Sequence, residues 1–184
     1  MSWPVVATTD IYQGYVIGVR RDSLRGDDGS TFDRDVIAHR GSVGVVAIDD
    51  RERLLVVTQY RHPPRQRLVE LPAGLLDNPD EDPEQAARRE LAEEGHVTAE
   101  HWSRLLELVP SPGVSDEVIT IYLAEGVSDA AVPMGFVAEH EESTMTREWV
   151  PLADVVDAVL AGEVKNAALV AGALAAWVRR TPAR

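Results

Sequence analysis

The stretch Leu71–His96 reads LPAGLLDNPDEDPEQAARRELAEEGH, and its second half is predicted to form a helix with well-marked ends. Asp82 is a favourable N-cap, Pro83 suits the first helical position, and Gln85 can complete a capping box with Asp82. Gly95 is predicted to end the helix, because glycine is common where helices terminate.

Three glutamates fall on one turn of this predicted helix. Glu90 and Glu94 are four residues apart and share a face, with Glu93 beside them, while Ala87 and Leu91 form an apolar stripe that can be buried. Like charges at this spacing destabilise an isolated helix by about 0.2–0.5 kcal/mol per pair. Clustered carboxylates suit a hard divalent cation such as Mg²⁺. For the glutamates alone an acidic, solvated helix is the simpler interpretation, and the surrounding motif favours the metal site.

That motif resembles the Nudix box, in which a glycine, five residues and a glutamate are followed by seven residues and Arg-Glu-apolar-X-Glu-Glu-X-Gly-apolar. Glu81, the seven residues after it and Arg89–Gly95 fit this pattern position for position. Two departures exist: six residues separate Gly74 from Glu81, and Gly95 comes one position early, so that His96 stands where the pattern has its glycine and Val97 stands at the apolar position. The resemblance implies the Nudix fold.

Within that family the chain is similar to the ADP-ribose pyrophosphatases, particularly the actinobacterial kind, from Gln59 to about Trp177. The matching segments outside the box are Gln59–Arg61, Glu70–Asp77, Ser111–Gly113 and Gly162–Asn166. Pro112 stands where that subfamily usually carries a proline. The implied reaction is hydrolysis of ADP-ribose to AMP and ribose 5-phosphate, a step of nucleotide-sugar metabolism.

The resemblance also implies a metal site. Glu90 and Glu94 would bind Mg²⁺ or Mn²⁺, Glu93 would share the cluster, and the carbonyl of Ala73 would complete it. Arg89 would hold a glutamate of the box in place, with Glu81 as one candidate; an ordinary surface arginine is the alternative interpretation.

The general base is expected outside the box, in the acidic loop between Met134 and Thr146. Its candidates are Glu142, Glu141 and Glu139, with Glu142 favoured by comparison with the actinobacterial enzymes. Charge runs are usually solvated surface, and that interpretation stays open for each single residue. For the loop as a whole the catalytic interpretation is favoured, because loops on a rigid scaffold often carry catalytic groups.

Candidate substrate-binding residues lie on both sides of the box. They are Arg61, Glu70, Pro112, Gly113 and Glu117. Arg61 can hold a phosphate by bidentate contact, and Glu117 can accept hydrogen bonds from ribose hydroxyls or a metal-bound water. A structural pairing of Arg61 with Glu70 is the competing interpretation.

The order of elements predicts the α/β class, as an α/β/α sandwich with a mixed sheet. We expect two domains: a small N-terminal β module over residues 1–40, which the resemblance implicates in homodimerisation, and a Nudix domain over residues 41–184. The β-rich runs are 5–7, 15–19, 36–38, 43–48, 54–58, 68–71, 105–109 and 118–123, and helices are expected after the acidic loop at 152–160 and 166–179.

Composition narrows the class of protein. The 184 residues carry 31 acidic and 18 basic side chains, a formal net charge of -13 that argues against a nucleic-acid binder. There are no cysteines, no signal peptide is apparent and the apolar run 167–178 is too short for a bilayer, so a cytoplasmic protein without membrane attachment is expected. His62, His96, His101 and His140 lack a common metal spacing and are expected at the surface or in turns.

Alternative functions stay open at this point. Other nucleoside diphosphate sugars or dinucleotides are possible substrates within the same reaction class. A non-catalytic module that senses ADP-ribose is the alternative from a different class, and the complete glutamate set argues against it.

Overall fold

The computed structural model describes residues 3–78, 80–131, 133, 135–136 and 140–181, with the side chain of Glu142 excepted. The chain divides into two compact units, residues 1–41 with 109–118, and residues 42–108 with 119–184. The sequence placed segment 109–118 in the larger domain. It groups with the N-terminal strands instead, because Ile37 N–H donates to Val114 O at 2.8 Å and Asp116 N–H donates to Ile37 O at 3.2 Å.

The first unit is built on a three-stranded antiparallel sheet in the order β1 (Val5–Gln13), β2 (Ile17–Arg25), β3 (Thr31–His39). Every residue of β1 is exposed to solvent. Arg20 on β2 donates to Asp22 at 3.1 Å and to Asp116 at 2.7 Å, which fastens segment 109–118 to the sheet. This unit is therefore joined mainly by backbone pairing and surface charges.

The larger unit contains two sheets. The antiparallel sheet has the order β10 (Thr146–Pro151), β5 (Arg53–Arg61), β6 (Gln66–Glu70). The mixed sheet has the order β7 (Ala73–Leu75), β4 (Ser42–Ala47), β9 (Ile119–Asp129), β8 (Val97–Leu108), and its β4–β9 pair is parallel.

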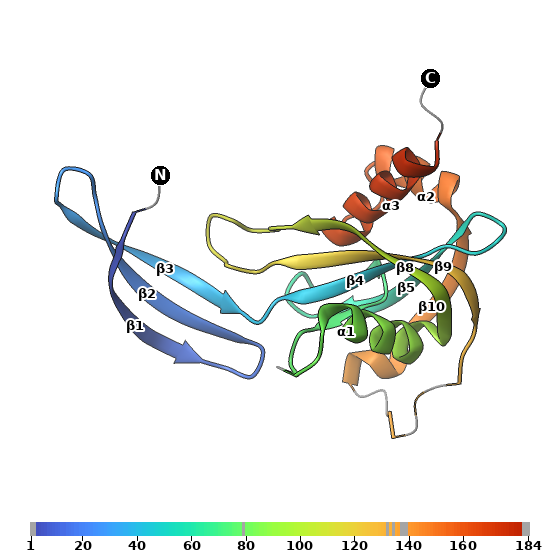
Figure 1. The fold of residues 1–184 in the computed structure, drawn as a ribbon, viewed down its shortest axis with the longest axis horizontal. Helices are drawn as coiled ribbons and strands as arrows, with labels where there is room; N and C mark the ends of the chain where they lie inside the picture. The colour runs from blue at the N-terminus through green and yellow to red at the C-terminus, as the bar shows by residue number, and fades with distance from the viewer. Residues whose placement is uncertain (1–2, 79, 132, 134, 137–139, 182–184) are drawn as a thin grey trace. The chain divides into compact units, whose positions relative to one another are not determined.

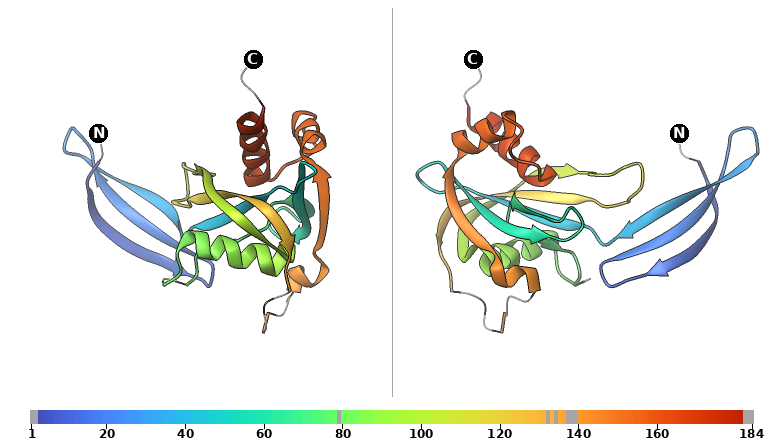
Figure 2. Two further views of the ribbon diagram at one scale, coloured as in Figure 1. Left: turned by 45° about the vertical axis from the view of Figure 1, so that its right-hand side comes forward. Right: turned by 180° about the vertical axis from the view of Figure 1, so that it is seen from behind.

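Helices cover both sides of this unit. Helix α1 (Pro83–Glu90), continued by a π-helical turn (Leu91–Gly95), lies on one side, and α2 (Leu152–Leu160) and α3 (Ala167–Arg180) lie on the other (Figures 1 and 2). The predicted α/β/α sandwich with a mixed sheet is confirmed. Each helix in the described part of the chain is too short to cross a membrane.

Alternation along the central strands produces two separate cores. Val46 of β4 and Ile121 of β9 pack in the cluster beneath α2 and α3, whereas Val45 and Tyr122, one residue away on each strand, pack in the cluster beneath α1. Successive side chains of a strand point to opposite faces, so continuous apolar runs can serve both cores. The apolar stripe of α1 and the π turn, which includes Ala87 and Leu91, packs into the second of these clusters and so fixes the helix on the sheet.

Most of the expected elements are present, but β7, β10 and the first half of β8 were not predicted. The strands predicted at 43–48, 54–58 and 68–71 correspond to β4, β5 and β6, and both C-terminal helices are confirmed. The first half of β8, from Val97 to Arg104, was not expected. Its apolar and polar residues do not alternate cleanly, and its hydrogen-bond partner is the distant β9.

Candidate active site

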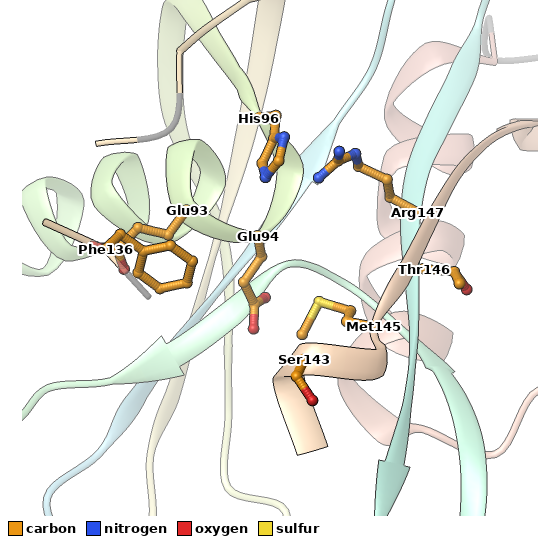
Figure 3. A pocket seen from close by; sticks show the side chains of 8 residues that line it. All are labelled: Glu93, Glu94, His96, Phe136, Ser143, Met145, Thr146 and Arg147. Atoms are coloured by element: carbon orange, nitrogen blue, oxygen red, sulfur yellow. The ribbon is translucent and has the colours of Figure 1, made fainter. Parts of the chain in front are cut away.

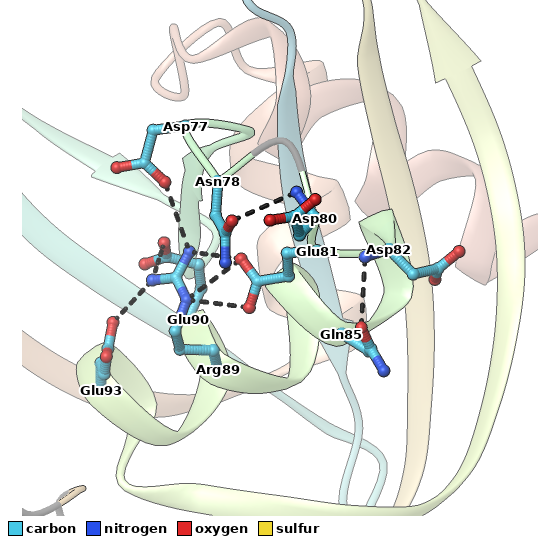
Figure 4. Close-up of polar contacts among 9 residues, drawn as sticks. All are labelled: Asp77, Asn78, Asp80, Glu81, Asp82, Gln85, Arg89, Glu90 and Glu93. Atoms are coloured by element: carbon cyan, nitrogen blue, oxygen red, sulfur yellow. Dashed lines mark hydrogen bonds and ion pairs between the residues drawn. The ribbon is translucent and has the colours of Figure 1, made fainter.

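The box helix begins as the sequence predicts. The Asp82 side chain accepts from Glu84 N–H at 2.8 Å and the Gln85 side chain accepts from Asp82 N–H at 3.2 Å, so the capping box is confirmed (Figure 4). Ala87 and Leu91 are fully buried in the core beneath the helix. This anchors the polar face of the helix in one orientation.

The end of the helix differs from a simple α-helix. Residues 91–95 form a π turn, and the left-handed residue that follows is His96 (φ 57°), one position beyond the predicted stop at Gly95. Gly95 is needed for space instead, because a Cβ there would lie 2.8 Å from Leu55 Cδ2. Val97 is 5% exposed and takes the core position expected of it. Single π turns inside helices are frequent at functional sites.

Arg89 contacts three carboxylates of the box. Its Nη1 donates to Glu90 Oε1 at 2.6 Å and to Glu93 Oε2 at 2.9 Å, and its Nε donates to Glu81 Oε1 at 3.2 Å (Figure 4). Burial lowers the pKa of Arg89, but the bonds and charges of these carboxylates outweigh burial and raise the pKa above its ordinary value. Arg89 is therefore a permanent positive charge that offsets the repulsion within the cluster.

Strand β7 lies against the other side of the glutamates. Ala73 N–H donates to Glu94 Oε2 at 2.9 Å. At Gly74 an added Cβ would lie 2.0 Å from Glu90 Oε1, so the carboxylate of Glu90 rests directly on the glycine backbone. The absence of a side chain at position 74 is thus what allows Glu90, 9% exposed, to occupy its place.

These donors are chemically suited to a hard divalent cation. Glu90 and Glu93 converge on one nitrogen of Arg89, and Glu94 accepts from the backbone N–H of Ala73, so three carboxylates are positioned by neighbouring groups of the box and β7. Within the described residues no three Asp, Glu or His side chains are already gathered at ion-binding distance. The oxygens are held instead by Arg89 and the Ala73 N–H.

Glu70, on β6, is the second buried acid of this region. It is 3% exposed and accepts from Arg61 Nη2 at 2.7 Å, from Arg61 Nε at 3.0 Å and from Gln59 Nε2 at 3.5 Å. The structure thus shows the pairing of Arg61 with Glu70 that the sequence left open. A role of either residue in substrate binding stays a prediction.

The loop that carries the expected base is partly described. Residues 140–144 form a short 3₁₀ helix that contains exposed Glu141 and the backbone of Glu142. Arg67 on β6 donates through Nη2 to Thr144 O at 2.9 Å and to Thr58 O at 3.0 Å, which ties the end of this helix to the sheet. Glu139 and the side chain of Glu142 lie outside the described residues, so their roles stay predictions.

A cavity of about 200 Å³ opens beside the glutamates. Its lining consists of Glu93, Glu94, His96, Phe136, Ser143, Met145, Thr146 and Arg147 (Figure 3). Only Glu93 and Glu94 of these were singled out as site residues from the sequence; the other six, His96 and Arg147 among them, were not. The departure of His96 from the box pattern was the available signal, whereas nothing in the local sequence distinguishes Arg147.

The remaining candidates, Pro112, Gly113 and Glu117, belong to the first unit. Pro112 and Gly113 are exposed, and Glu117 Oε1 lies 3.9 Å from His39 Nδ1. Their role in substrate binding stays a prediction.

Comparison with known proteins agrees with this geometry. The NUDIX domain profile matches residues 38–171. The chain belongs to the Nudix family. It is 41% identical to an ADP-ribose pyrophosphatase of Mycobacterium tuberculosis, over 95% of this chain and 83% of that protein. It is 37% identical to a methanol dehydrogenase activator of Bacillus methanolicus and 35% identical to an ADP-ribose pyrophosphatase of Bacillus subtilis, each over 67% of this chain and 66% of the relative.

A solved structure shares the Nudix architecture. The crystal structure of an ADP compounds hydrolase superposes with a TM-score of 0.80 at 20% identity, covering 97% of this chain and 95% of that one. At this identity the likeness supports the fold. The Nudix assignment made from the box is confirmed.

Proposed function

We propose that this Nudix enzyme hydrolyses the pyrophosphate bond of ADP-ribose to give AMP and ribose 5-phosphate, with Mg²⁺ or Mn²⁺ as cofactor. The observation that carries the proposal is the 41% identity to the ADP-ribose pyrophosphatase of M. tuberculosis over 95% of the chain. The assembled cluster of Arg89 with Glu81, Glu90 and Glu93 supports a catalytic interpretation over a sensor.

Glu90, Glu93, Glu94 and the carbonyl of Ala73 are the residues that would hold the cofactor. A divalent cation supplies charge neutralisation for the phosphates and a water of lowered pKa. Arg89 acts as a positioning residue, since it fixes two of the glutamates and Glu81 about one guanidinium. Gly74 keeps the backbone of β7 within reach of the same cluster.

The hydrolysis requires a base that accepts a proton from the attacking water. We assign this role to Glu142, with Glu141 and then Glu139 as the next candidates in the same loop. The oxygen of the water forms a bond to one phosphorus, the bridging oxygen leaves with the other, and the base takes the proton. Arg67 supports this step indirectly, because it fastens Thr144 of the same loop to β5.

The proposal is tested by a substrate panel with Mg²⁺ and with Mn²⁺. ADP-ribose, GDP- and UDP-sugars and a dinucleotide are incubated with the protein, and the products are separated by chromatography. We expect AMP and ribose 5-phosphate from ADP-ribose at the highest kcat/KM. Binding of ADP-ribose without release of AMP would contradict the proposal and favour the sensor.

Replacement of the base separates rate from affinity. Glu142→Gln keeps the size of the side chain and removes its basicity, so kcat should fall about 10²–10⁴-fold while KM changes little. Steady-state kinetics measure both constants, and Glu141→Gln is the matched control on the same short helix. Unchanged turnover in Glu142→Gln would pass the role to Glu141 or Glu139.

We also propose a cytoplasmic homodimer in which the N-terminal strands contribute to the contact between subunits. The support is the exposed apolar side chains of the first unit, such as Ile11 on β1 at 52% and Tyr15 on the turn between β1 and β2 at 87%. Sedimentation tests the assembly, and a single 20.1 kDa species would rule out the dimer.

A further inference from the structure

The cavity beside the box has an acidic side and a basic side. Glu93 and Glu94 line one side, and His96 and Arg147 line the other, with the guanidinium of Arg147 directed toward the imidazole (Figure 3). Both basic residues also line the adjoining cavity, of about 410 Å³, which contains no residue of the box before Gly95. His96 and Arg147 therefore stand at the boundary between the glutamates and this second space.

Among the described arginines of the larger unit, some form ion pairs with carboxylates and others form none; the second group consists of Arg51, Arg65, Arg67, Arg147 and Arg179, of which only Arg147 lines both cavities. Those that form ion pairs with carboxylates include Arg53, Arg61, Arg88, Arg89, Arg104 and Arg180. Arg147 forms none with any carboxylate of the residues described by the structure. In a chain with 31 acids and 18 bases, an arginine that lines a cavity without a carboxylate partner among the described residues is a candidate site for an external anion.

His96 is placed beside Arg147 at a conformational cost. Its φ of 57° is in the left-handed region, which residues other than glycine rarely adopt, and such positions cluster at functional sites. His96 occupies the position at which the box has a glycine, and it lines the cavity, whereas the next residue, Val97, is buried in the core.

We propose that Arg147, with His96 beside it, binds a phosphoryl group of the substrate and retains it as a phosphate monoester after cleavage. An arginine recognises phosphate by two parallel N–H···O bonds, and imidazole nitrogens supply a further polar contact. The glutamates on the acidic side would hold the cation that offsets the charge at the reacting phosphorus, and the basic side would hold the phosphate charge that faces away from it. This subsite rests on the proposed hydrolysis, which supplies the phosphate monoesters.

The proposal predicts a loss of affinity for phosphate when Arg147 is neutralised. Arg147→Met keeps most of the length of the side chain, and we expect KM for ADP-ribose to rise about tenfold to a hundredfold, the effect of losing a charged hydrogen bond. Arg147→Lys should recover part of the affinity, because it restores the charge without the bidentate geometry. His96→Asn, which tolerates the left-handed backbone, should raise KM less than Arg147→Met does.

Arg51→Met is the matched control. Arg51 is an exposed arginine on the turn between β4 and β5 and lines neither cavity, so its replacement removes the same net charge without touching the subsite. Its KM should equal that of the unmodified enzyme. An equal rise in Arg51→Met and Arg147→Met would show a general charge effect and overturn the subsite.

Direct binding separates this proposal from the proposed reaction. Calorimetry with AMP and with ribose 5-phosphate, in the absence of turnover, should show weaker binding of at least one monoester to Arg147→Met, and the affected product identifies the phosphate held there. If the unmodified protein binds a monoester through Arg147 but does not cleave ADP-ribose, the subsite stands and the reaction fails. If ADP-ribose is cleaved and neither KM nor the affinity for either product changes in Arg147→Met, the subsite is overturned.

Discussion

The two units of this chain are stabilised in different ways. In the larger unit, strands β4, β5 and β9 send alternate side chains into two cores, and residues such as Val45, Val46 and Leu169 are 0% exposed. In the first unit, every residue of β1 is exposed, and large side chains such as Tyr15 reach 87% exposure. Three-stranded sheets are stable on their own when one face is apolar and covered.

What joins the first unit is mostly polar. Arg20 links Asp22 and Asp116, Arg21 pairs with Asp35 at 2.7 Å, and backbone bonds join β3 to segment 109–118. Exposed ion pairs contribute about 0–1 kcal/mol each, far less than a buried leucine. The larger unit, with its two cores, can therefore hold the residues of the site in fixed positions. The first unit instead leaves apolar side chains exposed, and these are available for assembly.

Within the larger unit, loss of a box carboxylate should have the largest effect on activity. Glu94→Gln keeps an acceptor for Ala73 N–H but removes the charge, so kcat should fall about 10²–10³-fold and metal affinity should weaken. Rates measured over a Mg²⁺ titration, with calorimetry of Mn²⁺ binding, check both effects. Normal metal-dependent activity would count heavily against the proposed ligands, and an unchanged melting temperature would show that the cores are intact.

Removal of apolar bulk should affect the two units unequally. Leu169→Ala, at a fully buried position of α3, should lower the free energy of unfolding by roughly 2–5 kcal/mol, whereas Tyr15→Ala should change it by less than about 0.5 kcal/mol. Urea denaturation monitored by circular dichroism measures both. A large loss in Tyr15→Ala would contradict the contrast and indicate that this side chain is buried in an assembly.

A methyl group at position 74 should disturb the site more than the fold. Gly74→Ala would place a Cβ 2.0 Å from Glu90 Oε1, so the carboxylate must move, and we expect at least a tenfold loss of activity with a destabilisation of about 1–3 kcal/mol. Gly44→Ala is the control, because its Cβ would meet its nearest neighbour at an ordinary 3.6 Å. Equal activities in the two variants would show that the position of Glu90 does not depend on the absence of a side chain at Gly74.

Acid should destabilise the first unit, and of these changes we expect this one to have the smallest effect on the free energy of unfolding. The hydrogen bond from Thr8 lowers the pKa of Asp22. Burial raises the pKa of Asp116, but the hydrogen bonds from Arg20 and from the His39 backbone outweigh burial, so the pKa of Asp116 is lowered as well. Because both pKa values lie below those of the unfolded chain, the stabilisation is present above about pH 4 and is lost as the pH falls through the folded values. Hydrogen exchange of residues 17–25 and 109–118, corrected for intrinsic rates, should rise over that range.

The matched variant for the acid effect is Arg20→Met. Without the guanidinium, the pKa of each aspartate should return toward its ordinary value and the increase in exchange should begin at a higher pH. An identical pH profile in this variant would show that the ion pairs do not hold segment 109–118.

The sequence predicted features whose causes are local. The capping box at Asp82 and Gln85 and the burial of Ala87 and Leu91 depend on residues a few positions apart, and all of them are present. The contact between Arg89 and Glu81 likewise spans one short segment.

The features missed from the sequence depend on partners far along the chain. Segment 109–118 was assigned to the larger domain because its binding to Ile37 and Arg20 leaves no local pattern. The π turn at Leu91–Gly95 lies where Leu91 is buried in the core and Glu90 rests against Gly74, contacts that no local sequence pattern indicates. Arg147 approaches His96 only through the pairing of β10 with β5.

The parallel pairing of β4 with β9 has a consequence for synthesis on the ribosome. Strand β4 emerges early, but its partner at residues 119–129 is made only after the box helix and β8 are complete. Segment 109–118, which closes the first unit, is translated immediately before it. A nascent chain that pauses ahead of this region would leave β4 without its parallel partner and β3 without its contacts to segment 109–118, and such unpaired edges favour aggregation.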